Sequence, residues 1–547
     1  MDTNRLADLL FPHVTKSPEE LEAAYPKRDL PEGAKVTRLA PSPTGFMHFG
    51  TLFPALVSER LAHTGGGVLY LRIEDTDNKR RVEGAEQDLI DTLAHYQIHF
   101  DEGATADGEK GIYGPYRQSE RAPLYHVYAK KLVREGKAYP CFCTAEELSA
   151  IREEQEAAKL TPGYYGKWAK WRDASLEDVE AQLAAGSPYV LRLRSEGNVN
   201  NKVKFTDLIK GAIELTENDI DEVLLKSDGI PTYHFAHAVD DHLMGTTHVV
   251  RGEEWLPSLP KHLQIFSALG FRLPKYMHIS QLMKMEGDSK KKLSKRDMGA
   301  ALSDYKVNGY APECVLEYVM TLLNSNFEEW RRANPDAPMQ DFPFSIKKMS
   351  ASGCLYDYNK LIDVSKNTVS RMSAEQVYDY VYEWAGEYDP DFAAEIAKDP
   401  AYTKAILSIG RGGKKPRKDF ALWSEVKPFI GFFFDRYFTV EDAYDERFDK
   451  ADIRRALELF GESYDPADDM NAWFDKIKQI ADTLGFASDM KAYKQSPEAY
   501  RGSVADISMF LRIAVTGKLN SPDMYAVMQI LGRDRVLLRI RTMIEKL

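Results

Sequence analysis

The order of apolar runs and helical patterns predicts a strand–helix–strand unit near the start of the chain. Residues 36–39 and 68–73 form short apolar runs typical of strands, and residues 51–62 repeat apolar side chains at helical spacing. A βαβ unit of this kind implies a parallel sheet, with ligands bound at the carboxyl ends of its strands. We therefore expect an α/β domain with a ligand site where these strands end.

The pattern changes further along the chain. Amphipathic helices are expected at 145–158 and 176–185, and a strand at 189–194, in a stretch that interrupts the α/β pattern. The α/β pattern then returns, and from about residue 304 helical spacing continues to the C-terminus. The expected parts are an N-terminal extension (1–33), two halves of an α/β domain (34–115 and 227–270), an insertion (116–226), a connecting region (271–370) and a helical region (371–547).

Composition indicates a multidomain protein of a reducing compartment. The 547 residues exceed what one hydrophobic core supports, and no run of about 18 apolar residues suggests a membrane span. The N-terminus does not fit a signal peptide and the four cysteines argue against a disulfide framework, so we expect a cytoplasmic protein. The net charge is −12, yet basic residues gather at 290–296 and 411–418. Such strips suit a polyanionic partner, although a solvated surface is the alternative for either one.

Two short segments carry the candidate chemistry. Residues 40–51, Ala-Pro-Ser-Pro-Thr-Gly-Phe-Met-His-Phe-Gly-Thr, place His48 on a strand-to-helix turn, and helix N-termini attract phosphate. Residues 291–296, Lys-Lys-Leu-Ser-Lys-Arg, are expected on a loop that closes over anionic oxygens. Singly, each has a plain alternative: a structural histidine in a turn, or a solvated basic loop.

Taken together, the two segments are typical of a site that activates a carboxylate with ATP. His48 would donate to phosphate oxygens, and Gly50 would permit close approach because it lacks a Cβ. Lys292 and Lys295, with Ser294 between them, would neutralise the departing pyrophosphate. Such a reaction needs positioning and charge stabilisation rather than covalent help from the protein.

The residues in and around these segments resemble a known family. Residues 48–51 are similar to the HIGH motif of class I aminoacyl-tRNA synthetases, and residues 292–296 are similar to their KMSKS motif. Within that class the chain resembles the bacterial glutamyl-tRNA synthetases, in blocks that follow the family's order. The blocks are 37–45, 72–77, 114–121, 225–229, 231–234, 239–245 and 514–517.

The resemblance implies a fold and a reaction. The fold is an α/β Rossmann-type catalytic domain split by an α+β insertion that binds the tRNA acceptor end, then a stem-contact region and an all-α anticodon-binding region. The substrates would be L-glutamate, ATP with Mg²⁺, and tRNA(Glu), in a monomeric enzyme. Whether tRNA(Gln) is also charged with glutamate stays open.

Carried over position by position, the resemblance also implies residue roles. Arg38, with Ser42 and Arg251, would pair with the side-chain carboxylate of glutamate, and Glu74 would hold its ammonium group. Further glutamate contacts are expected from Ala40, Tyr233 and His237. The expected ATP contacts are His48, Gly50, Glu254, Leu282, Lys292, Ser294 and Lys295, of which His48, Gly50, Lys292 and Lys295 would be catalytic. Arg417 is the candidate for an anticodon contact.

Some features depart from the family pattern. His237 stands where asparagine is expected. Cys141 and Cys143 resemble the start of a zinc site found in some relatives, but residues 164–170 supply no further ligands. Tetrahedral zinc takes four ligands, so we expect no structural zinc.

Four alternatives share part of the pattern. A glutaminyl-tRNA synthetase has both motifs, but in that branch an aspartate follows the tyrosine where this chain has His234. A truncated relative that glutamylates a modified tRNA base lacks the helical C-terminal half. A nucleotidyltransferase for a small metabolite does not need the strip at 411–418, and a tRNA-binding scaffold does not need Lys292 or Lys295.

Overall fold

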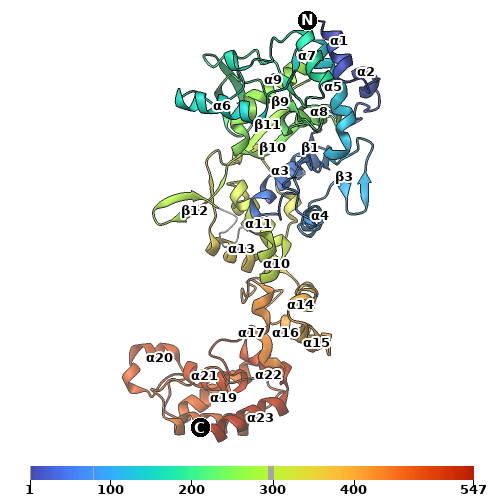
Figure 1. Cartoon of the computed structure of the whole chain (residues 1–547). Coiled ribbons are helices and arrows are strands. Elements are labelled where there is room, and N and C mark those ends of the chain that lie inside the picture. Colours follow the sequence, from blue (N-terminus) through green and yellow to red (C-terminus); the bar gives the residue numbers. More distant parts are fainter. Residues whose placement is uncertain (1, 78, 294–300) are drawn as a thin grey trace. The chain divides into compact units, whose positions relative to one another are not determined.

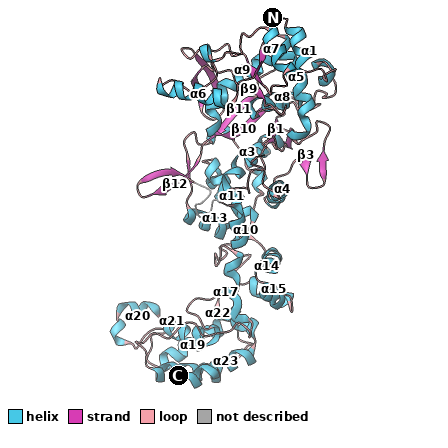
Figure 2. Cartoon of the chain, viewed as in Figure 1, coloured by secondary structure: helices cyan, strands magenta, loops and turns pink. Residues whose placement is uncertain are grey.

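The computed structural model describes residues 2–77, 79–293 and 301–547. Contacts between residues divide the chain into two compact units. The first comprises residues 1–303 and 319–357, and the second comprises residues 304–318 and 358–547. Figure 1 shows the order of the elements along the ribbon, and Figure 2 shows that strands give way to helices in the C-terminal part of the chain.

A four-stranded sheet in the first unit, parallel except for its last strand, contains the predicted βαβ unit. Its strands are β1 (Val36–Leu39), β2 (Val68–Leu71), β3 (Glu102–Thr105) and β4 (Gly108–Lys110). β1, β2 and β3 run parallel, and α3 (Leu52–His63) crosses from β1 to β2, so this prediction is confirmed. Because α3 buries an almost continuous apolar surface, it packs against the sheet rather than facing solvent.

A second parallel pair of strands lies beside β1. It consists of β10 (His248–Gly252) and β11 (Lys275–Ile279). The backbone N–H of Thr247, directly before β10, donates to the carbonyl of Val36 at 2.9 Å. The carboxyl ends of β1, β2 and β10 therefore lie near one another, where an α/β fold binds its ligands.

The insertion between these halves is an α+β structure. Its strands are β5 (Ala138–Cys141), β6 (Val190–Leu193) and β9 (Val223–Leu225) in one antiparallel sheet, and β7 (Lys202–Asp207) with β8 (Gly211–Thr216) in a hairpin. Its helices are α6 (Ala145–Ala157) and α7 (Leu176–Ala184). Capping boxes at Thr144 and Ser175 begin these two helices at the predicted residues.

The N-terminal extension packs into the core of the first unit. It forms α1 (Thr3–Leu10) and α2 (Pro18–Glu22), whose apolar side chains share one buried cluster with α5 (Ala122–Arg134). The ammonium of Lys130 donates to the carbonyls of Phe11 and Val14 at 3.0 Å each. The extension is thus held by burial and by hydrogen bonds to its backbone.

The basic run is partly a strand, not a loop throughout as expected. β13 (Ser289–Lys292) pairs antiparallel with β12 (Leu282–Glu286), and β14 (Cys354–Leu355) pairs parallel with β12. Lys290–Lys292 form a strand because the hairpin pairs their backbone N–H and C=O groups with β12, and this pairing does not depend on the charge of the side chains. Ser294, Lys295 and Arg296 lie outside the described residues.

The second unit is helical in all its described elements, as predicted. Its buried cluster joins apolar side chains from successive helices, among them Trp423, Phe460 and Phe510. The helices from residue 358 onward are α13 (Tyr358–Arg371), α14 (Ala374–Tyr388), α15 (Pro390–Ile396), α16 (Pro400–Leu407), α17 (Val426–Ile430), α18 (Lys450–Ser463), α19 (Met470–Thr483), α20 (Met490–Gln495), α21 (Val504–Thr516), α22 (Met524–Leu531) and α23 (Arg533–Lys546).

The remaining helices precede α13 along the chain. They are α4 (Ala85–His95), α8 (Tyr233–Leu243), α9 (Leu259–Leu269), α10 (Leu302–Asn308), α11 (Pro312–Leu323) and α12 (Phe327–Ala333). Among the described residues, no helix combines the length and the apolar character that a membrane crossing requires.

Candidate active site

A cavity of about 1460 Å³ opens in the first unit where the strands of the α/β domain end. The carboxyl ends of β1, β2 and β10, the turn before α3 and the starts of α8 and β12 all contribute to its lining. The predicted site residues in the lining are Arg38, Ala40, Ser42, His48, Gly50, Glu74, Tyr233, Arg251, Glu254, Leu282 and Lys292. The cavity thus lies at the edge of the sheet where the βαβ argument predicts a ligand site.

Arginines and acids form a buried network along one wall of the cavity. Oδ2 of Asp241 lies 3.4 Å from Nε of Arg38, and Oδ1 accepts a hydrogen bond of 2.7 Å from Arg72, which also donates to Glu74 at 3.0 Å. Burial opposes the charge of Asp241, but the two arginines hold its pKa well below its usual range. Burial raises the pKa of Glu74. A cationic ligand group would relieve that cost, so Glu74 is the acid suited to receive one.

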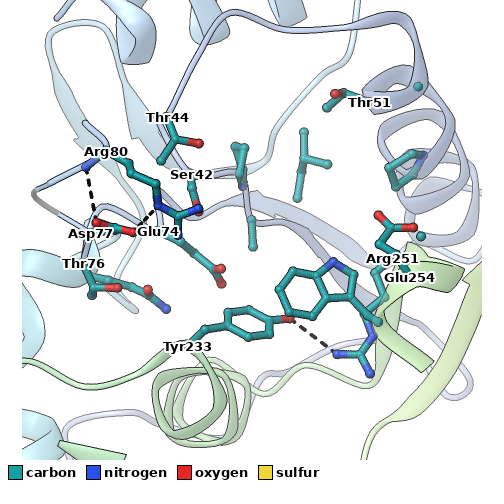
Figure 3. A pocket seen from close by; sticks show the side chains of 18 of the residues that line it. Ser42, Thr44, Thr51, Glu74, Thr76, Asp77, Arg80, Tyr233, Arg251 and Glu254 are labelled. Atoms are coloured by element: carbon teal, nitrogen blue, oxygen red, sulfur yellow. Dashed lines mark hydrogen bonds and ion pairs between the residues drawn. The ribbon is translucent and has the colours of Figure 1, made fainter. Parts of the chain in front are cut away.

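Arg251 is a buried cation with no acidic partner among the described residues. Its Nε donates to Nε2 of His278 at 2.9 Å, and its Nη1 lies 3.1 Å from Nδ1 of His262 and 3.4 Å from the hydroxyl of Tyr233. Nη2 is buried without a hydrogen-bond partner. Burial lowers the pKa of both histidines, so they are neutral at pH 7. Figure 3 shows Tyr233 reaching toward Arg251, with Glu74 pointing into the same cavity.

His48 lies on the turn that leads into α3. Its carbonyl accepts a hydrogen bond of 2.9 Å from the N–H of Thr51 across the 3₁₀ turn Phe49–Thr51. A Cβ added to Gly50 would come within 3.2 Å of Nδ1 of His48, a close contact that glycine avoids. The imidazole and the turn therefore share the amino end of a helix, where phosphate is favoured.

Glu254, Leu282 and Lys292 line the cavity from other elements. Glu254 follows β10 and is exposed, Leu282 begins β12, and Lys292 ends β13 with an exposed side chain. The carbonyl of Leu282 accepts a hydrogen bond of 2.9 Å from the N–H of Leu293. The hairpin thus brings one lysine of the basic run to the cavity.

His237 does not belong to the cavity lining, contrary to the expected substrate contact. It is fully buried and its ring stacks behind Tyr233, with centroids 5.8 Å apart. Nε2 hydrogen bonds with the hydroxyl of Tyr276 at 2.8 Å, and Nδ1 lies 2.9 Å from Oδ2 of Asp241. Burial lowers the pKa of His237 to about 4, so the ring is neutral. The residue supports the pocket from behind.

The second basic strip, in the second unit, divides into structural and exposed residues. Nε and Nη1 of Arg411 donate to the carbonyls of Leu407 and Val369 at 2.8 and 2.6 Å, so this arginine holds the backbone together. Arg417 is exposed and pairs with Asp419 at 2.8 Å. Arg417 therefore remains accessible to an anionic partner that could exchange with Asp419.

The cysteine pair occupies the end of β5. Cys141 is buried, and the thiol of Cys143 donates to the hydroxyl of Tyr164 at 3.5 Å. Within the part of the chain that the structure describes, no three His, Cys, Asp or Glu side chains are placed to hold a metal ion.

Several residues of the site were not predicted from the sequence. Asp241 lies within the similar block 239–245 but received no role. His278 is the one polar residue in the apolar run 276–279, which was a signal that it needs a buried partner. That partner, Asp207, is 71 residues away, so spacing could not identify it.

Known proteins match this chain over most of its length. Residues 35–332 match a family described as class I tRNA synthetases (E and Q), catalytic domain, and residues 414–544 match an anticodon binding domain. Glutamate–tRNA ligases of Clostridium perfringens and Acetivibrio thermocellus are 50% and 49% identical, covering 99% and 100% of this chain and 100% of each relative. The crystal structure of a glutamate tRNA ligase from Elizabethkingia meningosepticum, in complex with its amino acid, is 28% identical, with a TM-score of 0.75 over 94% of this chain and 99% of that chain.

Proposed function

The chain belongs to the class I tRNA synthetase family for glutamate and glutamine, and we propose that it acts as a glutamate–tRNA ligase through the cavity of its first unit. It activates L-glutamate with ATP to glutamyl-adenylate, releasing pyrophosphate. It then transfers glutamate to the 3′-terminal adenosine of tRNA(Glu), releasing AMP. Membership in this family confirms the expected fold class, a Rossmann-type catalytic domain followed by a helical anticodon-binding region.

The observation that carries the proposal is the environment of Arg251. A buried charge is costly unless it is paired, and the described partners of Arg251 are neutral. A substrate carboxylate beside Nη2 would supply both the missing acceptor and the missing charge. Guanidinium–carboxylate pairs are charge-assisted and often bidentate, which gives orientation as well as affinity.

The charges of the pocket fit glutamate better than glutamine. Arg38 and Arg251, with Ser42, bind the side-chain carboxylate, and Glu74 holds the ammonium group. A carboxamide would turn an NH₂ group toward an arginine donor and leave a buried donor unpaired, at about 1–3 kcal/mol. That cost is roughly 5- to 160-fold in selectivity for each donor, so glutamine is rejected without an editing site. Ala40 and Tyr233 complete the pocket.

ATP lies along the turn before α3 and the hairpin of β12 and β13. The carboxylate of glutamate attacks the α-phosphorus of Mg-ATP, and negative charge grows on the phosphate oxygens and the departing pyrophosphate. His48 donates a hydrogen bond to these oxygens, and Gly50 lets the nucleotide approach. Lys292 compensates the leaving group, together with Ser294 and Lys295, which lie outside the described residues. Glu254 binds the ribose and the backbone of Leu282 binds the adenine.

The RNA partner is tRNA(Glu). The insertion receives its acceptor end, residues 271–370 contact the stem, and the helical region reads the anticodon, with Arg417 as a candidate contact. The match of residues 414–544 to an anticodon binding domain supports this assignment. A non-discriminating enzyme that also charges tRNA(Gln) with glutamate is the alternative within the same chemistry. A cytoplasmic, monomeric enzyme stays a prediction.

Pyrophosphate exchange with glutamate or glutamine, each with and without transcribed tRNA, tests the proposal. Arg251→Gln is expected to raise the KM for glutamate by about tenfold or more, with the KM for ATP little changed. Arg192→Gln is the matched control, because Arg192 is buried in the same unit, its side chain donates to the backbone carbonyl of Asp221 in the insertion, and it is not part of the cavity lining. Exchange with glutamine alone would overturn the substrate. An unchanged KM in Arg251→Gln would overturn the role of Arg251.

A further inference from the structure

Asp207 connects the inserted hairpin to the catalytic domain. It ends β7 and is almost fully buried. Its Oδ1 accepts hydrogen bonds from the N–H groups of Ile209 and Lys210 at 2.9 and 2.8 Å, which shape the turn to β8. Its Oδ2 accepts from the backbone N–H of His278 at 3.1 Å and from Nδ1 of the same residue at 2.7 Å. One carboxylate thus holds both the turn and the histidine.

The turn of the hairpin is docked on the carboxyl ends of β10 and β11. The N–H of Leu208 donates to the carbonyl of Tyr276 at 3.0 Å. The ammonium of Lys210 donates to Oγ of Ser280 at 2.7 Å and forms an ion pair with Glu253. Asp207 therefore reaches His278 from a fixed position rather than from a free loop end.

The hydrogen bonds determine the tautomer of His278. An ionised carboxylate only accepts, so Nδ1 of His278 must carry the proton. Nε2 then holds a lone pair, and Nε of Arg251, which only donates, lies 2.9 Å from it. The opposite tautomer would place two donors against each other at Nε2. Asp207 is thus two hydrogen bonds away from the guanidinium of Arg251.

The same rules extend to the other side of the guanidinium. Nδ1 of His262 faces Nη1 of Arg251 at 3.1 Å, so this nitrogen is unprotonated and Nε2 carries the proton. That Nε2 lies 2.9 Å from Nδ1 of His234, which must therefore accept. His278 and His262 are thus neutral acceptors, and the hydrogen bonds determine the tautomer of each. They orient the guanidinium of Arg251 but do not neutralise its charge.

We propose that Asp207 is a positioning residue for Arg251: through His278 it presents an unprotonated nitrogen to the guanidinium and so directs Nη2 at the substrate carboxylate. This inference rests on the proposed role of Arg251 in binding glutamate. It ties the geometry of the amino acid pocket to the inserted hairpin, which belongs to a different part of the chain from the strands that hold the pocket. Outer groups of this kind commonly orient a functional side chain by fixing a histidine tautomer.

Asparagine has nearly the size and shape of aspartate, so Asp207→Asn changes the hydrogen-bond donors and acceptors at this position and leaves the volume of the side chain almost the same. If the amide oxygen keeps the N–H groups of Ile209 and Lys210, its NH₂ group faces both the backbone N–H of His278 and Nδ1 of the same residue. The contact with the backbone N–H costs stability whatever side chain residue 278 carries, whereas Nδ1 can respond by becoming an acceptor. Nε2 acquires the proton and confronts Nε of Arg251, donor against donor. If the amide is turned over, the NH₂ group confronts the turn instead, and the docking of the hairpin is lost.

The experiment compares Asp207→Asn with Asp221→Asn in the full-length enzyme. Asp221 is the matched control because it is also a fully buried carboxylate of the insertion, bonded to Tyr139, Arg172 and the N–H of Ser195, and it is not part of the cavity lining. Asp207→Asn is expected to raise the KM for glutamate by about tenfold or more, with the KM for ATP within about twofold of the wild type. Thermal unfolding of both variants measures the purely structural cost.

His278→Gln supplies the second test. The glutamine carbonyl can accept from Nε of Arg251 without any tautomer, so Asp207→Asn should raise the KM for glutamate by less than about twofold in this background. The inference is overturned if Asp207→Asn and Asp221→Asn change the KM equally, or if the effect of Asp207→Asn persists in the His278→Gln background. An Arg251→Gln variant with normal glutamate KM would instead overturn the proposed role of Arg251 itself, which keeps the two failures distinguishable.

Discussion

His237 makes the stability of the first unit depend on pH in a way that one substitution removes. The ring is fully buried, and burial lowers its pKa from 6.5 to about 4 despite the nearby carboxylate of Asp241. Arg38 and Arg72 already compensate that carboxylate, so a third positive charge gains little there. We therefore predict that His237→Asn, which removes the titrating group, weakens the loss of stability in acid.

The sign and size follow from proton linkage. Between pH 6.5 and about 4 the unfolded chain holds a proton on His237 that the folded chain does not, so the free energy of unfolding falls as the pH falls. At about 1.36 kcal/mol per pH unit, the loss over this window is about 3 kcal/mol. Above pH 6.5 His237 is neutral in both states and takes nothing from the free energy of unfolding. Below about pH 4 it is protonated in both states, so its effect on the free energy of unfolding grows no further. Asparagine does not titrate, so the stability difference between variant and wild type changes by about 3 kcal/mol over the window.

Urea unfolding at several pH values, with pulsed hydrogen exchange of peptides from α8, reports the first unit alone. The packing lost in the variant is the same at every pH and cancels from the comparison. Buried histidines that do not interact with His237, such as His248, titrate in both proteins and cancel as well. A stability difference that stays constant within about 1 kcal/mol from pH 7 to 4 would refute the reasoning, because it would mean that burial does not keep His237 neutral.

Three further predictions concern the substrates. Gly50→Ala places a Cβ within 3.2 Å of Nδ1 of His48, so it should lower kcat of pyrophosphate exchange by about tenfold and leave the KM for glutamate unchanged. An unchanged kcat would show that the imidazole ring moves freely. Because the pKa of Glu74 lies above 4.5, the KM of the wild-type enzyme for glutamate should rise as the pH falls toward that pKa, whereas Glu74→Gln should have a high KM at every pH. A wild-type KM that stays constant down to pH 4.5 would contradict this. Arg417→Ala should weaken tRNA binding and reduce its salt slope by about 1, measured by filter binding at several salt concentrations; an equal slope would exclude a phosphate contact.

The location of the cavity followed from local patterns. Strand and helix periods depend on neighbouring residues, so the unit β1–α3–β2 was predictable, and parallel strands must bring their carboxyl ends to one edge. That edge is where the structure places Arg38, His48 and Glu74. The helices of the insertion were equally predictable, because their capping residues lie next to their apolar stripes.

The sequence by itself determined the order of elements, the edge that holds the site and the kinds of side chain that reach it. Only the tertiary structure decided which polar groups meet: Asp207 with His278, His262 with Arg251, and His237 with Tyr276 rather than with the cavity. It also made a strand of Ser289–Lys292. The physical reason is that periodicity depends on neighbours a few residues apart, whereas the pairing of buried donors and acceptors depends on packing between segments that are distant along the chain.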